Sequence, residues 1–169
     1  MEEVFNKEKS SGDIASIIED NTQIHEQLEQ IIKEQYNVNN PVIYENEYHK
    51  PLIKELHFNI SHSNNLVLIG ISNDNIGLDI EMVNSLKDLT LLKKNIFNNE
   101  LLDDEILTKK WTQIEAKFKY DGTGIIYSNL KDMNLNNENI KSFDILDSDN
   151  NKYYFSVKSN EEFKINVIH

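Results

Sequence analysis

Two carboxylate side chains stand two residues apart in the segment IGLDIE, residues 76–81. The alternation of apolar residues predicts a β-strand that places Asp79 and Glu81 on one face, together with Gly77. Carboxylates that share a face repel each other unless a cation, a proton or water screens their charge. The segment is therefore either a strand with one solvated face or part of a site for a hard cation such as Mg²⁺.

A third carboxylate occurs in the segment WTQIEAKFK, residues 111–119. In a helix, Glu115 and Lys119 lie one turn apart on the same face. They could form an ordinary surface ion pair, with Trp111 as an ordinary core residue. They could also extend a cation site, in which Glu115 adds a third acid and Lys119 neutralises a phosphate group.

A strand-like segment, FNISHS at residues 58–63, ends in Ser61, His62 and Ser63. A histidine in this place is commonly a hydrogen-bonded structural residue, but these polar groups could also face a ligand. The sequence has no Gly-x-Ser-x-Gly elbow, which argues against a serine hydrolase. The other histidines lack the spacing of metal ligands, and the chain has no cysteine.

The elements that must position these residues predict an α+β fold. Helical spacing of apolar residues predicts helices at about 21–36, 86–107 and 107–119, the last ended by glycines 122 and 124. Strands are predicted at 42–45, 57–61, 65–72, 76–83, 141–146, 152–158 and 162–168. The short connection after residue 72 predicts an antiparallel hairpin of 65–72 with 76–83. The last three strands predict a small antiparallel sheet, and residues 1–12 an irregular start.

The amino-acid composition limits which classes of molecule the protein is expected to bind. The chain has 169 residues and a net charge of −12, and its 17 basic residues are all lysines. This acidic balance argues against nucleic acid as a partner. Without arginine, a phosphate group must be held by lysine, histidine, backbone N–H groups or a metal ion. No signal or membrane-spanning pattern is present, so we expect a cytoplasmic protein of one domain with no membrane partner.

In this order, FNISHS, IGLDIE and WTQIEAKFK followed by GTGI (122–125) resemble the three signature motifs of the 4′-phosphopantetheinyl transferase superfamily. The likeness is to the larger, surfactin-synthetase-activating type and covers about residues 48–126. The segment YHKP (48–51) is similar to the Gly-Lys-Pro segment of that family. The resemblance implies two related α+β halves with antiparallel sheets and a cleft between them. The halves would be residues 1–72 and 73–169, with the first half abbreviated.

The resemblance also implies an activity. In that family, the 4′-phosphopantetheine arm of coenzyme A, the co-substrate, is transferred to a serine of an acyl- or peptidyl-carrier protein. The reaction depends on Mg²⁺ at the pyrophosphate and releases 3′,5′-ADP. Either a monomer or a small homo-oligomer is compatible with the sequence.

By motif position, the resemblance assigns a role to each polar residue of these segments. The implied metal ligands are Asp79, Glu81 and Glu115, the implied catalytic residues are Glu115 and Lys119, and the implied coenzyme contacts are Lys50, Ser61, His62 and Lys119. Ile114 departs from the pattern, because the family usually has lysine directly before the helical glutamate. An alternative is therefore a catalytically weakened or inactive relative that binds a carrier protein or coenzyme A.

Overall fold

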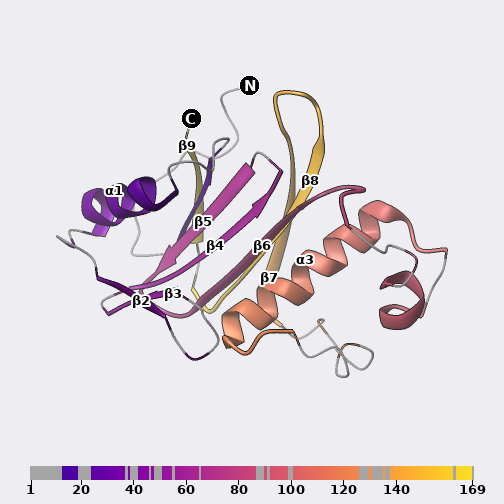
Figure 1. Ribbon diagram of the computed structural model, residues 1–169, viewed down its shortest axis with the longest axis horizontal. Helices are drawn as coiled ribbons and strands as arrows, with labels where there is room; N and C mark the ends of the chain where they lie inside the picture. The colour runs from indigo at the N-terminus through magenta and orange to yellow at the C-terminus, as the bar shows by residue number, and fades with distance from the viewer. Residues whose placement is uncertain are drawn as a thin grey trace.

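The computed structural model describes most of the chain between residues 13 and 168. The described residues are 13–18, 24–36, 38, 42–45, 47, 51–54, 56–64, 66–86, 90, 92–98, 101–125, 130, 135, 138–161 and 163–168. They form helices packed on two larger β-sheets, with a small third sheet at one side (Figure 1). The predicted α+β class is confirmed. None of the described helices is both long and apolar enough to cross a lipid bilayer.

The first sheet has four strands in the order β4-β5-β1-β9. These strands are β1 (Asp13–Ile18), β4 (His57–Ser63), β5 (Leu66–Ser72) and β9 (Phe163–Ile168). The pairs β4–β5 and β5–β1 are antiparallel, whereas β1–β9 is parallel. The small sheet pairs β2 (Ile43–Glu45) with β3 (Pro51–Ile53).

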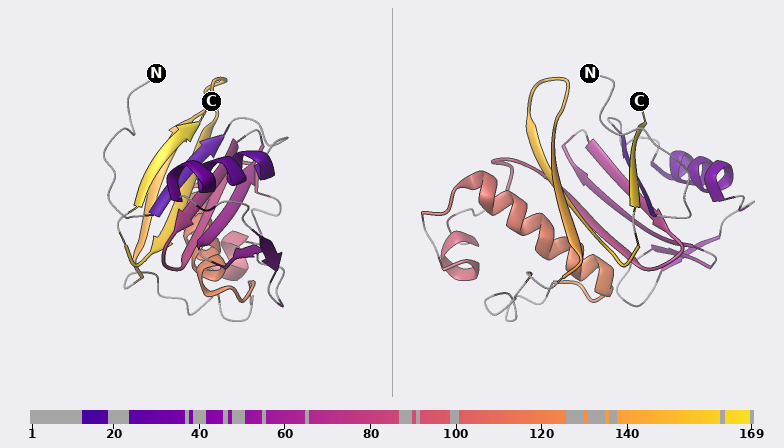
Figure 2. Two further views of the ribbon diagram at one scale, coloured as in Figure 1. Left: turned by 90° about the vertical axis from the view of Figure 1, so that its left-hand side faces the viewer. Right: turned by 180° about the vertical axis from the view of Figure 1, so that it is seen from behind.

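The second sheet is fully antiparallel, in the order β6-β8-β7. Its strands are β6 (Ile76–Met82), β7 (Ile140–Leu146) and β8 (Lys152–Ser159). The helical elements are α1 (Ile24–Tyr36), the short π-helical segment η1 (Leu92–Ile96) and α3 (Asp104–Asp121). Figures 1 and 2 show α1 covering the first sheet and α3 lying along the second.

The two sheets share a core through β5, whose seven residues are all buried. One face of β5, including Val67 and Ile69, packs with Leu28 and Ile32 of α1. Its other face packs on the second sheet, where the apolar row of β6 is fully buried with Tyr153, Phe155 and Val157 of β8. A continuous apolar run suits β5 because both of its faces are covered. The layers therefore run α1, first sheet, second sheet, α3.

The predicted hairpin between residues 65–72 and 76–83 is wrong. β5 pairs with β4 on one edge and with β1 on the other, so neither edge is free for β6, which pairs with β8. In the short connection, the Ser72 hydroxyl accepts from the Asp74 N–H at 2.9 Å. The Asn75 side chain donates to the Tyr120 carbonyl at the end of α3. The connection therefore carries the chain from the first sheet to the second.

Two other predicted elements are also corrected. The strand at 162–168 does not join its two predicted neighbours, because β9 pairs with β1 while β6 completes the sheet of β7 and β8. The helix predicted at 86–107 is interrupted, since residues 101–103 are not helical and α3 begins at Asp104. The β1 strand was not predicted, and residues 1–12 lie outside the described part of the chain.

Candidate functional site

The backbones of α3 and β6 approach each other closely at Gly77. A Cβ atom at this position would lie 2.1 Å from the Ala116 carbonyl oxygen and 2.2 Å from the Tyr120 backbone nitrogen. Both are main-chain atoms of a helix, which cannot turn aside as a side chain could. Glycine in the strand and a small residue, Ala116, in the helix therefore allow α3 to lie directly on β6. This contact brings Glu115 and Lys119 over the polar face of the strand.

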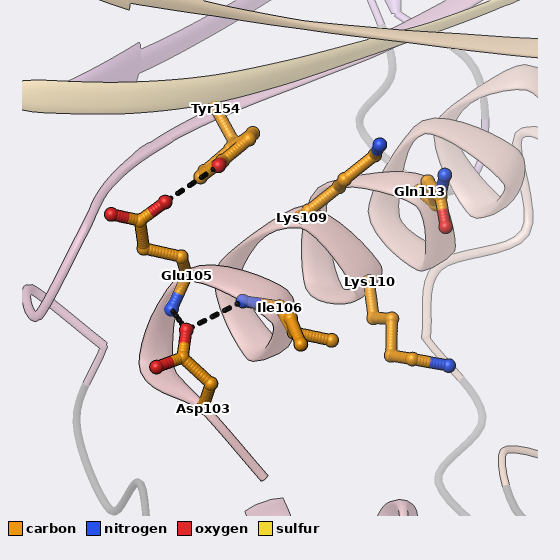
Figure 3. Close-up of a pocket in the computed structure, with 7 residues that line it drawn as sticks. All are labelled: Asp103, Glu105, Ile106, Lys109, Lys110, Gln113 and Tyr154. Atoms are coloured by element: carbon orange, nitrogen blue, oxygen red, sulfur yellow. Dashed lines mark hydrogen bonds between the residues drawn. The ribbon is translucent and has the colours of Figure 1, made fainter.

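Both ends of α3 are fixed by caps. The Asp103 side chain accepts from the backbone N–H groups of Glu105 and Ile106, two of the four donors that a helix start leaves without an intrahelical partner (Figure 3). Gly122 ends the helix with φ 71° and donates to the Phe118 carbonyl. The predicted glycine stop is confirmed, and the helix is held in register over β6.

Asp79 is the most buried acid of the site, with 2% of its surface exposed. Its Oδ1 accepts from the Ser61 hydroxyl and from the Lys119 ammonium group, each at 2.7 Å. Its Oδ2 is buried and has no hydrogen-bond partner among the described residues. An ionised carboxylate with an unpaired buried oxygen is unfavourable unless another positive group supplies the missing interaction.

Glu81 lies two residues further along the same face of β6. Its Oε2 accepts from the hydroxyls of Ser63 at 3.1 Å and Ser85 at 3.3 Å. Burial of the carboxyl, followed by the negative charge of Asp79, raises the pKa of Glu81 above its ordinary value. The two acids of this face thus repel each other, and the positive charge of Lys119 offsets part of that repulsion.

Glu115 reaches this face from α3. Its carboxylate lies 3.8 Å from the Lys119 ammonium nitrogen. Burial raises the pKa of Glu115 to about 7, and the negative charge of Asp79 adds to that effect. A carboxyl with a pKa near neutrality can exchange a proton in either direction at physiological pH.

The raised pKa of Glu115 predicts that the metal-free protein loses stability as pH rises through about 7. The unfolded-state value is near 4.5, so between these values the folded state binds a proton that the unfolded state releases. The stabilising contribution is complete below the lower value and is lost as pH passes the higher one. In urea unfolding with EDTA, Glu115→Gln should flatten the decline between pH 5 and 8. Parallel declines of parent and variant would contradict the assignment.

The predicted site residues separate into three groups. The structure brings together Asp79, Glu81, Glu115, Lys119 and Ser61 between β4, β6 and α3. His62 is exposed, and strand alternation places it on the opposite face of β4 from Ser61 and Ser63. Lys50 lies outside the described residues.

The donor set fits a hard divalent cation. Three carboxylates balanced by one ammonium group leave net negative charge, and the unpartnered Asp79 Oδ2 is an oxygen donor of the type that Mg²⁺ prefers. No three Asp, Glu or His side chains in the described ranges are arranged as a preformed metal site. Lys119, which contacts both Asp79 and Glu115, instead supplies the positive charge there.

Two residues, Ser63 and Gly77, have structural roles at the site that the sequence analysis does not predict. Ser63 bonds Glu81, and Gly77 permits the approach of α3. Strand alternation was a usable signal for Ser63, because it places this residue on the same face as Ser61. The role of Gly77 depends on a helix that lies far along the chain, which local patterns do not identify.

Ile114 stands where the motif pattern usually has lysine, and its surroundings in the structure account for this departure. It is 2% exposed and packs in a cluster with Trp111, Phe118 and Leu130, on a different side of α3 from Lys119. The position that lacks the usual lysine is therefore part of the core. A charged group there would lose its hydration among apolar side chains.

A shallow cavity of about 440 Å³ lies on the other flank of α3 (Figure 3). Its lining residues are Asp103, Glu105, Ile106, Lys109, Lys110, Gln113 and Tyr154. On this flank, α3 contacts β7 through the hydrogen bond that Gln113 donates to Ser142. It contacts β8 through Glu105, which accepts from Lys152 and Tyr154. The cavity is thus separate from the carboxylates, which face β6.

Two curated proteins resemble the chain over part of its length. The 4′-phosphopantetheinyl transferase gsp of Aneurinibacillus migulanus is 38% identical over 79 residues, which is 46% of this chain and 30% of that protein. The 4′-phosphopantetheinyl transferase ffp of Bacillus subtilis is 32% identical over 109 residues, which is 56% of this chain and 48% of that protein. No family model matches the chain. The chain therefore spans less than half the length of each relative, and its predicted resemblance to this superfamily is confirmed.

Proposed function

We propose that the protein transfers the 4′-phosphopantetheine arm of coenzyme A to a serine of an acyl- or peptidyl-carrier protein. The observation that carries this proposal is the convergence of Asp79, Glu81, Glu115 and Lys119, from two separate motifs, at one partly buried site. Partial similarity to two proteins named for this activity supports it. The reaction needs charge neutralisation and positioning at a pyrophosphate more than it needs a strong base.

In the proposed reaction, the carrier serine oxygen forms a bond to the phosphorus of the phosphopantetheine group. The bond from that phosphorus to the leaving 3′,5′-ADP breaks. Glu115 accepts the serine proton. The Lys119 ammonium group, which contacts Asp79 and Ser61, faces the developing negative charge on the leaving phosphate.

Asp79, Glu81 and Glu115 would hold Mg²⁺, which supplies charge neutralisation at the pyrophosphate when it is bound. Ser61, His62 and Lys50 are proposed as contacts for the phosphate groups of the coenzyme. Ser61 bonds Asp79 and Lys119 and so lies beside the acids, whereas His62 is on the opposite face of β4.

The test is incubation of the purified protein with coenzyme A, Mg²⁺ and a panel of apo-carrier proteins, followed by intact mass measurement. We expect a mass gain of about 340 Da on at least one carrier, the size of the transferred arm, and no gain when EDTA replaces Mg²⁺. A Lys119→Met variant serves as the control for catalysis by the site.

A second candidate function is a binding module that has lost turnover. Ile114, buried where the family usually carries a lysine, is the observation that favours it. Calorimetry separates the two candidates. Binding of coenzyme A or a carrier without any mass gain would support the module and contradict the transferase.

A further inference from the structure

Strands β4 and β6 belong to different sheets, yet they are joined along part of their length. The join consists of side-chain hydroxyls from β4 that bond to groups on β6. The Ser63 hydroxyl accepts from the Met82 backbone N–H at 3.0 Å, and the Ser61 hydroxyl contacts the Ile80 backbone N–H at 3.4 Å. We call this join the serine seam, consisting of Ser61 and Ser63.

Each serine of the seam also donates to an acid of the candidate site. Ser61 donates to Asp79 at 2.7 Å and Ser63 donates to Glu81 at 3.1 Å. The same arrangement thus occurs twice, two residues apart on both strands. In each case, the serine hydroxyl donates to the carboxylate of an acid on β6. The same hydroxyl accepts from the backbone N–H of the residue directly after that acid.

The seam is well placed to fix the acids in space. Ser61 and Ser63 are each 6% exposed, so their hydroxyls are largely protected from exchange with solvent. A hydroxyl that bonds both strand backbone and carboxylate restricts the rotation of that carboxylate about its side-chain bonds. Two acids that repel each other would otherwise turn apart.

We propose that Ser61 and Ser63 are positioning residues that hold Asp79 and Glu81 in the orientation that binds a divalent cation. The serine seam thereby couples cation affinity to the contact between the two sheets. Partners that orient metal ligands commonly contribute tenfold to a hundredfold to metal affinity. The cation part of this inference rests on the proposed function, whereas the seam itself does not.

Ser63→Ala is the sharper variant, because the bonds of Ser63 go to Glu81 and Met82, whereas Ser61 also accepts from Lys119. Its Mn²⁺ affinity, measured by calorimetry without coenzyme or carrier, should fall by about tenfold. Ser63→Thr keeps the hydroxyl and should stay within about threefold of the parent. Ser72→Ala is the matched control, since Ser72 is also a buried strand serine that accepts one backbone N–H, but contacts neither acid.

A second readout does not require a metal ion. Amide hydrogen exchange at Met82 should become about threefold to tenfold faster in Ser63→Ala, and remain unchanged in Ser72→Ala. Unchanged amide exchange at Met82 would contradict the proposal that Ser63 joins the two strands by accepting from the Met82 N–H. Equal loss of Mn²⁺ affinity in Ser63→Ala, Ser63→Thr and Ser72→Ala would overturn the positioning role. If the parent protein binds no Mn²⁺, the cation role fails together with the proposed function, and the exchange result still decides the seam.

Discussion

Gly77→Ala is expected to destabilise the protein by about 1–3 kcal/mol or more, and to reduce any activity of the site. The new methyl group would lie within 2.2 Å of two backbone atoms of α3, so the helix has to move away from β6. A displacement of about 1 Å between reacting groups can cost a hundredfold in rate. Urea unfolding measures the first effect, and the carrier mass assay measures the second.

Gly70→Ala is the matched control for this variant. Gly70 is also a buried strand glycine, but its new methyl group would meet only the ends of the Leu78 and Ile76 side chains, at 2.4 and 2.8 Å. Side-chain ends can change rotamer, whereas a helix backbone cannot, so the loss of stability should be smaller than in Gly77→Ala. An equal or larger loss in Gly70→Ala would contradict the special role of the contact between β6 and α3.

Asp79→Asn is expected to reduce the proposed transfer of the phosphopantetheine arm by roughly a hundredfold to a thousandfold. Asparagine has nearly the same shape and still accepts from Ser61, but it removes the negative charge that a cation and Lys119 would share. Stabilisation of the protein against heat by Mg²⁺ should decrease at the same time, because ligand binding to the folded state raises its stability. Mass spectrometry and thermal unfolding with and without Mg²⁺ measure the two effects.

The matched control for the charge change is Asp144→Asn. Asp144 is an exposed acid on β7, so this variant makes the same substitution without touching the site. Lys119 is 30% exposed and can turn to solvent when Asp79 loses its charge, so Asp79→Asn should remain folded. Full transfer activity in a folded Asp79→Asn protein would remove this residue from the proposed mechanism.

Local patterns predicted much of the site because its key residues follow short periods. The period of two residues in β6 placed Asp79 and Glu81 on one face, and the helical period placed Glu115 one turn from Lys119. Both placements hold in the structure, where the four residues lie together. These relations depend only on residues close together in the sequence.

The errors concern contacts between distant segments. The hairpin prediction for β5 and β6 used the short connection alone, whereas strand pairing depends on which edges other strands already occupy. The pairing of β9 with β1 and the packing of α3 at Gly77 are likewise non-local. No local pattern records which sheet a strand will join, because either placement would bury its apolar face.

The parallel pairing of β1 with β9 affects how the chain can fold during translation. Asp13 is the register partner of Phe163, so the pair closes a loop of about 150 residues. A nascent chain can pair β1 with β5 once Ser72 has left the ribosome, but the outer edge of β1 stays open until β9 emerges. An open strand edge can pair with other chains. Early capture of β9 by β1 would therefore limit aggregation of newly made protein.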